Sequence, residues 1–197
     1  MEVMSQHAAD GDYIYFVTTN VQDGRWFFVI PERAEPLGQA KITCCRMKGF
    51  DLLAFAILPN HVHLLVRKLR AGEIIIRHTA TPQRTLENMR CREKFNASEW
   101  TFLFTHRRLS SRRSLQKPPC YTLSELMQSI KGTYSRSLPK GKFWHRRSFI
   151  RIIGSTEYLN NVLNYVRYNY RKMRLSEHYG QPPFVFYDHT PIDRLFY

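Results

Sequence analysis

Paired cysteines, long apolar runs and acidic residues are all scarce in this sequence, and each shortage excludes a class of protein. The four cysteines form no C-x-x-C pair, and Cys44 and Cys45 are adjacent, which fits neither a zinc-binding spacing nor a secreted disulfide framework. No stretch approaches the roughly 20 apolar residues of a membrane-spanning helix, and residues 1–12 lack the apolar run of a signal peptide. We therefore expect a cytoplasmic protein with reduced thiols and no membrane partner.

The shortage of acidic residues leaves a strongly basic chain. Against 16 Asp and Glu stand 30 Lys and Arg, which gives a formal net charge of +14. Such a charge attracts polyanions before any specific contact forms, and nucleic acid is the commonest of them. Because 14% of the residues are aromatic and can stack on unpaired bases, we favour nucleic-acid binding over a basic surface that is merely solvated.

At 197 residues the chain has room for one domain with a substantial core. Runs of β-branched and aromatic residues predict strands, and apolar residues at helical spacing predict helices. In chain order we expect a β-hairpin over 13–30 that turns at Asp23-Gly24, a helix over 31–48, strands over 50–58 and 61–66, a helix from 122, a strand within 143–153 and a helix over 155–174. This order predicts an α+β fold, with a ferredoxin-like (palm-like) antiparallel sheet and helices on one face.

A segment of different composition interrupts this order. The span from Arg67 to Lys117 carries thirteen Lys and Arg against four acidic residues, with weak periodicity and many breakers of regular structure. We interpret residues 1–197 as a single domain that contains a basic, flexible insertion at about 70–118. A C-terminal tail at about 176–197, rich in proline and aromatic residues, is expected to pack along the surface.

His61 and His63 are the first candidate functional residues. They lie on a predicted strand, where side chains alternate between faces, so both imidazoles project from the same face, roughly 6.5 Å apart at the backbone. Two histidines held in this way on a rigid strand can converge on one metal ion. The alternative is a pair of exposed strand histidines without a ligand, which is the commoner meaning of an isolated H-x-H.

Tyr165 and Asn169 on the last predicted helix form the second candidate site. At about 100° per residue, they lie together on the flank of the apolar stripe, whereas Tyr168 falls toward solvent and Tyr170 within the stripe. We therefore expect Tyr165 at the edge of the sheet, beside the amide of Asn169 one turn on. The alternative is a boundary tyrosine whose hydroxyl has an ordinary hydrogen-bond partner.

Together these residues predict a site for phosphoryl transfer. A phenol is a weak nucleophile because it is protonated near neutral pH, and a divalent cation that polarises the phosphate makes it competent. Two imidazoles and an amide oxygen suit Mg²⁺ or Mn²⁺, so Asn169 is the candidate third ligand beside His61 and His63.

Several stretches of the chain resemble, in the same order, motifs of the single-tyrosine transposases of bacterial insertion sequences, and most closely those of the REP-associated tyrosine transposases. The clearest is AFAILPNHVHLLV from Ala54, which resembles the family's His-hydrophobic-His (HUH) strand, typically MPNHVHLL. The others are YFVTT from Tyr15, LSELMQSIKGTYSRSL from Leu123, FWHRRSF from Phe143 and YVRYN from Tyr165. The last is similar to the segment that carries the family's nucleophile.

The resemblance implies cleavage of single-stranded DNA, usually at imperfect hairpins. It implies a 5′-phosphotyrosine bond to Tyr165 and a free 3′-hydroxyl, with rejoining that needs no ATP. Two departures stand out: the family usually has proline after its asparagine and glycine four residues later, and this chain has Tyr170 and Arg174. The helix is therefore expected to run longer here.

Basic and aromatic residues near the late strand are candidates for contacts to DNA. Trp144 with Arg146 and Arg147 precede that strand, in a position suited to stacking on an unpaired base and binding its phosphate. Lys131 and Arg136 lie on the preceding helix. For each of these the alternative is an ordinary solvated positive residue.

We therefore predict a metal-dependent DNA transposase that nicks and rejoins single-stranded DNA at hairpin, REP-like sequences, in the bacterial cytoplasm and associated with the nucleoid. A homodimer is left open. One rival is a non-catalytic single-stranded nucleic-acid-binding protein, which would carry aromatics on the sheet face in place of the convergent His61, His63 and Tyr165. Another is a metal-dependent nuclease that uses water.

Overall fold

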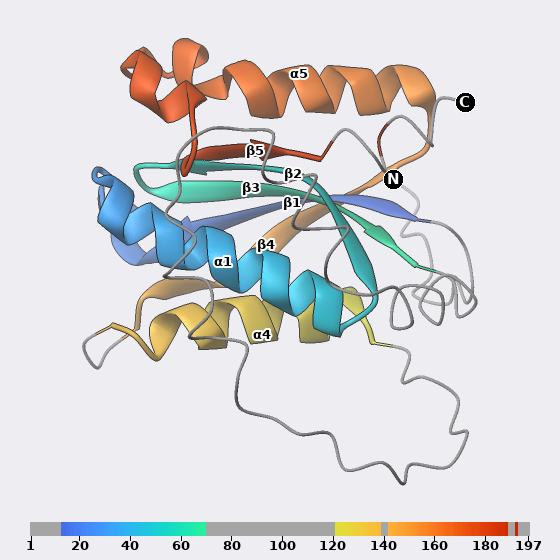
Figure 1. The fold of residues 1–197 in the computed structure, drawn as a ribbon, viewed down its shortest axis with the longest axis horizontal. Coiled ribbons are helices and arrows are strands. Elements are labelled where there is room, and N and C mark those ends of the chain that lie inside the picture. Colours follow the sequence, from blue (N-terminus) through green and yellow to red (C-terminus); the bar gives the residue numbers. More distant parts are fainter. Residues whose placement is uncertain (1–12, 70–120, 139–141, 189–191, 193–197) are drawn as a thin grey trace, which may run out of the picture. The chain divides into compact units, whose positions relative to one another are not determined.

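A five-stranded antiparallel sheet forms the core of the described structure (Figure 1). The computed structural model describes residues 13–69, 121–138, 142–188 and Ile192. The strands are β1 (Ile14–Val21), β2 (Phe50–Leu58), β3 (His61–Lys68), β4 (Trp144–Ile153) and β5 (Val185–Tyr187), in the order β4-β1-β3-β2-β5. The α-helices are α1 (Pro31–Met47), α4 (Leu123–Ser135) and α5 (Thr156–Lys172), with short 3-10 helices η1 (Gln22–Gly24) and η3 (Glu177–Gly180). The predicted α+β fold with an antiparallel sheet is confirmed.

The register around the central strand β3 decides which side chains share a face. Thr18 of β1 lies opposite His63 on one side, and Ala56 of β2 lies opposite His63 on the other. Directly opposite residues in an antiparallel pair project from the same face. Thr18, His63 and Ala56 therefore form one row across the three middle strands.

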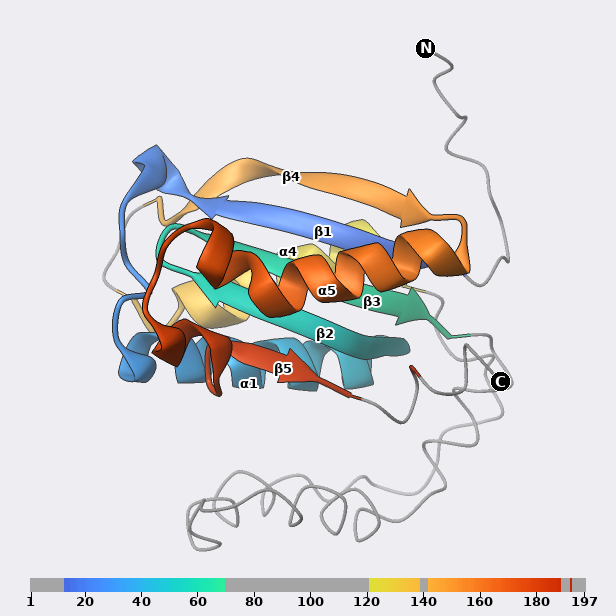
Figure 2. The ribbon, with the colours of Figure 1, turned by 90° about the horizontal axis from the view of Figure 1, so that it is seen from above.

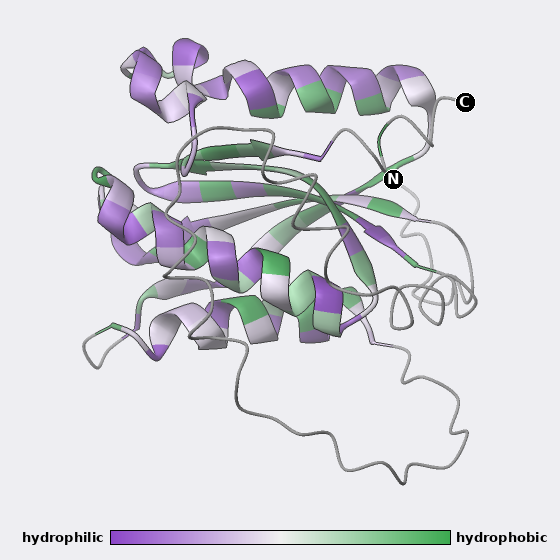
Figure 3. Ribbon diagram, viewed as in Figure 1, coloured by the Kyte–Doolittle hydropathy of each residue, from purple (hydrophilic) through white to green (hydrophobic). Residues whose placement is uncertain are grey.

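The helices cover both faces of the sheet, which corrects the prediction that they lie on one. Figure 1 shows α1 and α4 on one side and α5 on the other. The reason lies in β3, where residues 62–66 are buried without alternation, so apolar area on both faces needs cover. The apolar stripe of α5, with Leu159, Val162 and Val166 buried, faces the sheet (Figure 3).

The predicted hairpin over 13–30 is wrong in its second half. Residues 25–30 form no strand, although Asp23 and Gly24 adopt the positive φ angles of a tight turn. Both edges of β1 are already occupied, by β3 and by β4, so no ladder position is left for this segment. Instead the amides of Phe27 and Phe28 donate to the Pro59 carbonyl, at 2.7 and 2.9 Å, and the Phe28 ring is fully buried.

The two later helices follow their sequence signals closely. A capping box begins α4, where Thr122 Oγ1 accepts from the Glu125 amide and the Glu125 carboxylate accepts from the Thr122 amide. Helix α5 ends at Lys172, and Arg174 then adopts a φ of 54°. That left-handed conformation favours glycine, which is the residue usual at this position in the family that the chain resembles.

The C-terminal residues contribute more than the predicted surface tail, because β5 adds an edge strand beside β2. The predicted basic insertion at 70–118 lies outside the residues described. Within the described part of the chain, no helix is long and apolar enough to cross a membrane.

Gly180 fixes the end of α5 by lying against the buried ring of Tyr170. A Cβ at residue 180 would lie 2.6 Å from Tyr170 Cε1, so Gly180→Ala is expected to lower the free energy of unfolding by about 1–3 kcal/mol through overpacking. Gly154→Ala is the control, since a Cβ there meets nothing within 4 Å. Urea unfolding measures both, and equal effects would contradict the tight contact.

Lys41 of α1 is buried without a hydrogen-bond partner in the described structure. Its Nζ lies 3.9 Å from the centroid of the Phe55 ring, and burial holds the pKa of Lys41 well below its usual range. Lys41→Met is expected to raise the free energy of unfolding at neutral pH by about 1–3 kcal/mol, because it removes an unpaired polar group from the interior. The exposed neighbour Arg46→Met, as control, should change it by less than about 0.5 kcal/mol.

The pH dependence gives a second measurement on the Lys41→Met protein. Because the pKa of Lys41 is lower in the folded state than its usual value of 10.5, the unfolded chain holds a proton that the folded chain releases. Parent stability therefore rises as the pH increases toward 10.5, and the variant should lack this rise. A destabilised variant would show instead that Lys41 makes a net favourable contact.

Candidate metal and tyrosine site

His61 and His63 project from the face of β3 that α5 covers. Their ring centroids are 4.8 Å apart, and Val62 between them is buried on the opposite face. His63 is 3% exposed and stacks on Phe16 of β1, with a centroid distance of 5.3 Å. The two imidazoles therefore lie as the alternation of a strand predicts, on one face and close together.

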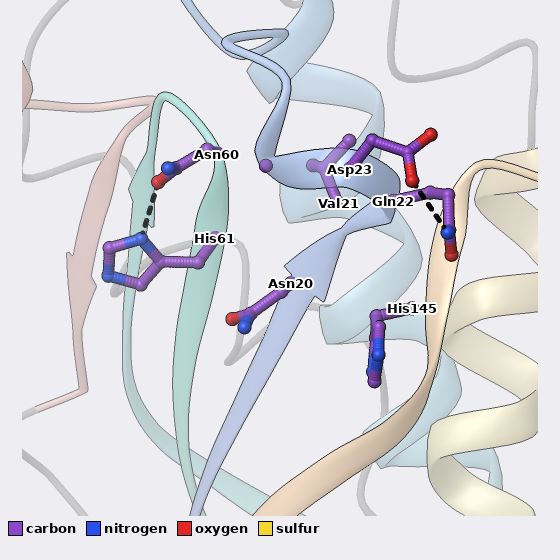
Figure 4. Close-up of a pocket in the computed structure, with 8 residues that line it drawn as sticks. Asn20, Val21, Gln22, Asp23, Asn60, His61 and His145 are labelled. Carbon is purple, nitrogen blue, oxygen red and sulfur yellow. Dashed lines mark hydrogen bonds between the residues drawn. The ribbon is translucent and has the colours of Figure 1, made fainter.

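Each imidazole is held through its Nδ1 atom. His63 Nδ1 lies 2.9 Å from Thr18 Oγ1, and His61 Nδ1 lies 2.7 Å from Asn60 Oδ1 (Figure 4). An amide oxygen only accepts, so His61 Nδ1 carries the proton and its Nε2 keeps a lone pair. His63 Nε2 is buried and has no hydrogen-bond partner among the residues described. Both Nε2 atoms are thus left for a ligand, in the arrangement that orients metal-binding histidines.

Burial also keeps these imidazoles neutral. It lowers the pKa of His61, and it lowers the pKa of His63 to about 3, with a smaller contribution from the neighbouring His61. Metal ions bind the neutral form of imidazole. At neutral pH both side chains are therefore in the state that a cation needs.

Tyr165 of α5 lies beside this pair. Its ring centroid is 5.1 Å from that of His63 and 6.0 Å from that of Phe16, and the side chain is 37% exposed. Tyr168 is more exposed and Tyr170 is buried. Of these three tyrosines, Tyr165 is the one in ring contact with a histidine of β3.

Asn169 lies one helical turn after Tyr165 and is 3% exposed. Its Nδ2 atom is buried and has no hydrogen-bond partner in the described part of the chain. Nδ2 is a hydrogen-bond donor, so an oxygen acceptor would satisfy it, whereas a cation would bind the other amide atom, Oδ1. Within the described residues no group of three or more His, Cys, Asp and Glu is placed to hold a metal, so Asn169 stays the predicted third ligand.

The donor atoms can bind a divalent cation. His63 Nε2, which has no partner among the described residues, the lone pair of His61 Nε2 and the Asn169 amide oxygen offer two nitrogen donors and one oxygen donor without a thiolate. For Mg²⁺ or Mn²⁺, waters and phosphate oxygens would supply the further oxygen ligands that these ions require. The roles of the three residues as ligands stay predictions.

A polar hollow of about 390 Å³ opens beside His61. Figure 4 shows Asn20 lying between His61 and His145, with Gln22 and Asp23 of η1 at the rim. The hollow is therefore lined both by His61 of the candidate site and by His145 at the start of β4.

The predicted DNA-binding residues are dispersed. Arg146 and Arg147 are exposed on β4. Lys131 lies on α4 and Arg136 directly follows that helix, on the sheet face opposite α5. Lys131 Nζ donates to the His145 carbonyl at 3.1 Å. The Trp144 ring packs against Phe28, Tyr134 and Phe143 in the core. The contacts of all five to DNA stay predictions.

Two residues near the site were not predicted from the sequence. Thr18 contacts His63 through a strand register that no local pattern specifies, although it stands within the YFVTT motif. Lys172 lies two turns after Tyr165, and its Nζ is 5.7 Å from the centroid of the tyrosine ring. The 3.6-residue period of the helix signals this second pairing.

Thr18 tests whether the hydrogen bond to His63 positions a metal ligand. Thr18→Val removes the hydroxyl and is expected to weaken Mn²⁺ binding about 10- to 100-fold, as loss of a partner of a ligating histidine does. Titration calorimetry measures the affinity. Thr19→Val is the matched control, because Thr19 Oγ1 is buried on the other face without a partner in the described structure; equal effects would contradict a positioning role.

Comparisons with known proteins support the fold. No family model and no curated protein matches the chain. Among solved structures, a REP-associated tyrosine transposase bound to a REP hairpin matches with a TM-score of 0.58 and 16% identity, over 100% of this chain and 88% of the other. A suspected transposase of Deinococcus radiodurans R1 covers 84% of this chain and 95% of its own, with 15% identity and a TM-score of 0.42. The chain is thus similar in fold to the REP-associated tyrosine transposase.

Proposed function

We propose that this chain nicks and rejoins single-stranded DNA at hairpin sequences, with Tyr165 as the nucleophile. The observation that carries the proposal is the convergence of three rings from two elements: His61 and His63 of β3, 4.8 Å apart, and Tyr165 of α5, 5.1 Å from His63. A protein that only binds nucleic acid has no need for two neutral imidazoles and a partly exposed tyrosine at one point. The shared fold adds support, since the solved relative is a tyrosine transposase bound to a REP hairpin.

In the proposed reaction Tyr165 Oη attacks the scissile phosphorus. A bond forms between phosphorus and the tyrosine oxygen, and the bond to the 3′ oxygen breaks. The phenol proton passes to solvent, and the leaving 3′ oxygen takes up a proton, which yields a 5′-phosphotyrosine and a free 3′-hydroxyl. Because one phosphodiester replaces another, a 3′-hydroxyl reverses the step without ATP or water.

The chain's own residues position the reactants. His61, His63 and Asn169 would hold the divalent cation, Mg²⁺ or Mn²⁺. When bound, the cation would polarise the phosphate and neutralise developing charge. Lys172, near the Tyr165 ring, is placed to neutralise phosphate charge independently of the metal.

The test is incubation of the full chain with 5′- or 3′-end-labelled single-stranded hairpins and Mn²⁺, read on denaturing gels. The expected result is cleavage, a 3′-hydroxyl product and a covalent adduct that survives denaturation. Cleavage without an adduct would favour a nuclease that uses water. Tight binding without cleavage would favour the non-catalytic DNA-binding protein.

A further inference from the structure

Phe149 is an exposed aromatic residue on the sheet face that carries the candidate site. It is 70% exposed, although it lies within β4. The register places Phe149 opposite Thr18, and Thr18 opposite His63 on the next strand. Since opposite residues share a face, Phe149, Thr18 and His63 form a row across β4, β1 and β3.

Arg151 continues this surface toward Tyr165. It is exposed and lies opposite Phe16, whose ring is 6.0 Å from that of Tyr165. Figure 2 shows that α5 passes over the middle of the sheet, and that among the described elements none covers β4 on this side. An aromatic ring and a guanidinium therefore lie on one face of an open strand, with only β1 between that strand and β3.

We propose that Phe149 is a stacking platform for an unpaired base of the DNA strand that enters the site, with Arg151 contacting the adjoining phosphate. The inference rests on the proposed function and adds a positioning residue to it. An aromatic ring on an open sheet stacks on bases of any sequence, and the neighbouring positive charge matches the polyanion. Stacking next to Thr18 and His63 would fix where along the strand the phosphate meets Tyr165.

A second copy of the chain is a less favourable partner for the open edge of β4 than a nucleic-acid strand. A two-fold antiparallel pairing of two β4 strands about Phe149 would set Arg147 of each copy opposite Arg151 of the other. Like charges directly opposite are destabilising, and arginines on an edge strand are a known protection against such pairing. The charge of β4 therefore favours a nucleic-acid strand.

The test compares Phe149→Ala with Ile150→Ala in the full chain carrying Tyr165→Phe, so that cleavage does not disturb binding. Ile150 is the matched control because it is 50% exposed on the same strand but lies opposite the buried Val17, on the other face. The probe is a single-stranded hairpin oligonucleotide with 2-aminopurine at each position flanking the hairpin in turn. Phe149→Ala is expected to weaken binding about 5- to 100-fold and to abolish fluorescence quenching at one position, whereas Ile150→Ala and Phe149→Trp should retain both.

Salt dependence separates the two residues of the platform. Arg151→Ala should lower the slope of log affinity against log salt by about one, and Phe149→Ala should leave the slope unchanged. The proposal is overturned if Phe149→Ala binds and quenches like the parent, or if Ile150→Ala is equally weakened. It is also overturned if light scattering shows that Phe149→Ala changes only the oligomeric state.

The stacking platform and the proposed function can be contradicted independently of each other. If the parent forms no adduct but quenching still depends on Phe149, the platform stands and the tyrosine chemistry is wrong. If the parent forms adducts, and Phe149→Ala alters neither the KM for the hairpin nor its affinity, the chemistry stands and the platform is wrong.

Discussion

Tyr165→Phe is expected to abolish the covalent protein–DNA adduct while leaving the fold, the metal affinity and the DNA affinity close to those of the parent. The substitution removes one oxygen and keeps the ring, its contact with His63 and its helical propensity. Adduct formation should fall below detection, because the other two tyrosines of this half of α5 are placed differently. Tyr170 is buried against Gly180, and Tyr168 lies near Arg167 and Arg171.

Tyr168→Phe is the matched control, since it makes the same chemical change on the same helix at an even more exposed position. The Tyr168→Phe protein should form adducts at the parental rate. An adduct on the Tyr165→Phe protein would contradict the assignment, and mass spectrometry of the adduct would then identify the true nucleophile.

Strand and helix periodicity alone predict how the central side chains of this site are oriented on their own elements. Alternation along β3 puts His61 and His63 on one face, and the helical period separates Tyr165 from Tyr168 and Tyr170. These are short-range properties of a regular backbone, so a local pattern is sufficient. The contact between β3 and α5 is long-range, and only the resemblance to a family supplied it.

Features that depend on competition between elements were not predictable in the same way. Residues 25–30 have strand-like composition, but β3 and β4 take both edges of β1. The helices cover both faces because β3 is buried throughout its centre. The apolar run in the sequence indicates this burial, but it does not indicate which helix covers which face. The strand β5 has the β-branched and aromatic composition of a strand, but three residues are too few to predict one, and it forms where β2 offers an edge.

The aromatic residues near β4 show the same limit. Trp144 and Phe149 lie five residues apart in one basic segment, and composition does not distinguish them. Trp144 packs against Phe28 and Tyr134, while Phe149 stays exposed, because the register of β4 turns the first toward α4 and the second toward α5. The proposed stacking platform is therefore a residue that the sequence did not single out.

His63→Leu is expected to abolish both the stabilisation of the protein by Mn²⁺ and the formation of adducts, without a loss of stability in the absence of metal. Leucine fills a similar volume and removes the buried Nε2 atom, which has no partner in the described structure, together with the Nδ1 contact to the half-buried Thr18. The two effects oppose each other, so the metal-free variant should be about as stable as the parent. In the parent, Mn²⁺ at 100 times its Kd should raise the free energy of unfolding by about 2.7 kcal/mol. In the variant this gain should vanish, and the adduct rate should fall at least about 100-fold, because the ion that polarises the phosphate is no longer held.

Two further measurements make the His63→Leu result specific. His178→Ala removes an exposed histidine of η3 that bonds Ser176 and should keep the full Mn²⁺ effect. Burial lowers the pKa of His63 to about 3 from its usual 6.5, so between pH 6.5 and 3 the unfolded chain binds a proton that the folded chain refuses, and the metal-free parent loses stability as the pH falls. The variant should lose less over the same window. A Mn²⁺ effect that survives in His63→Leu would place the cation elsewhere and leave the imidazole of His63 as a packed core residue.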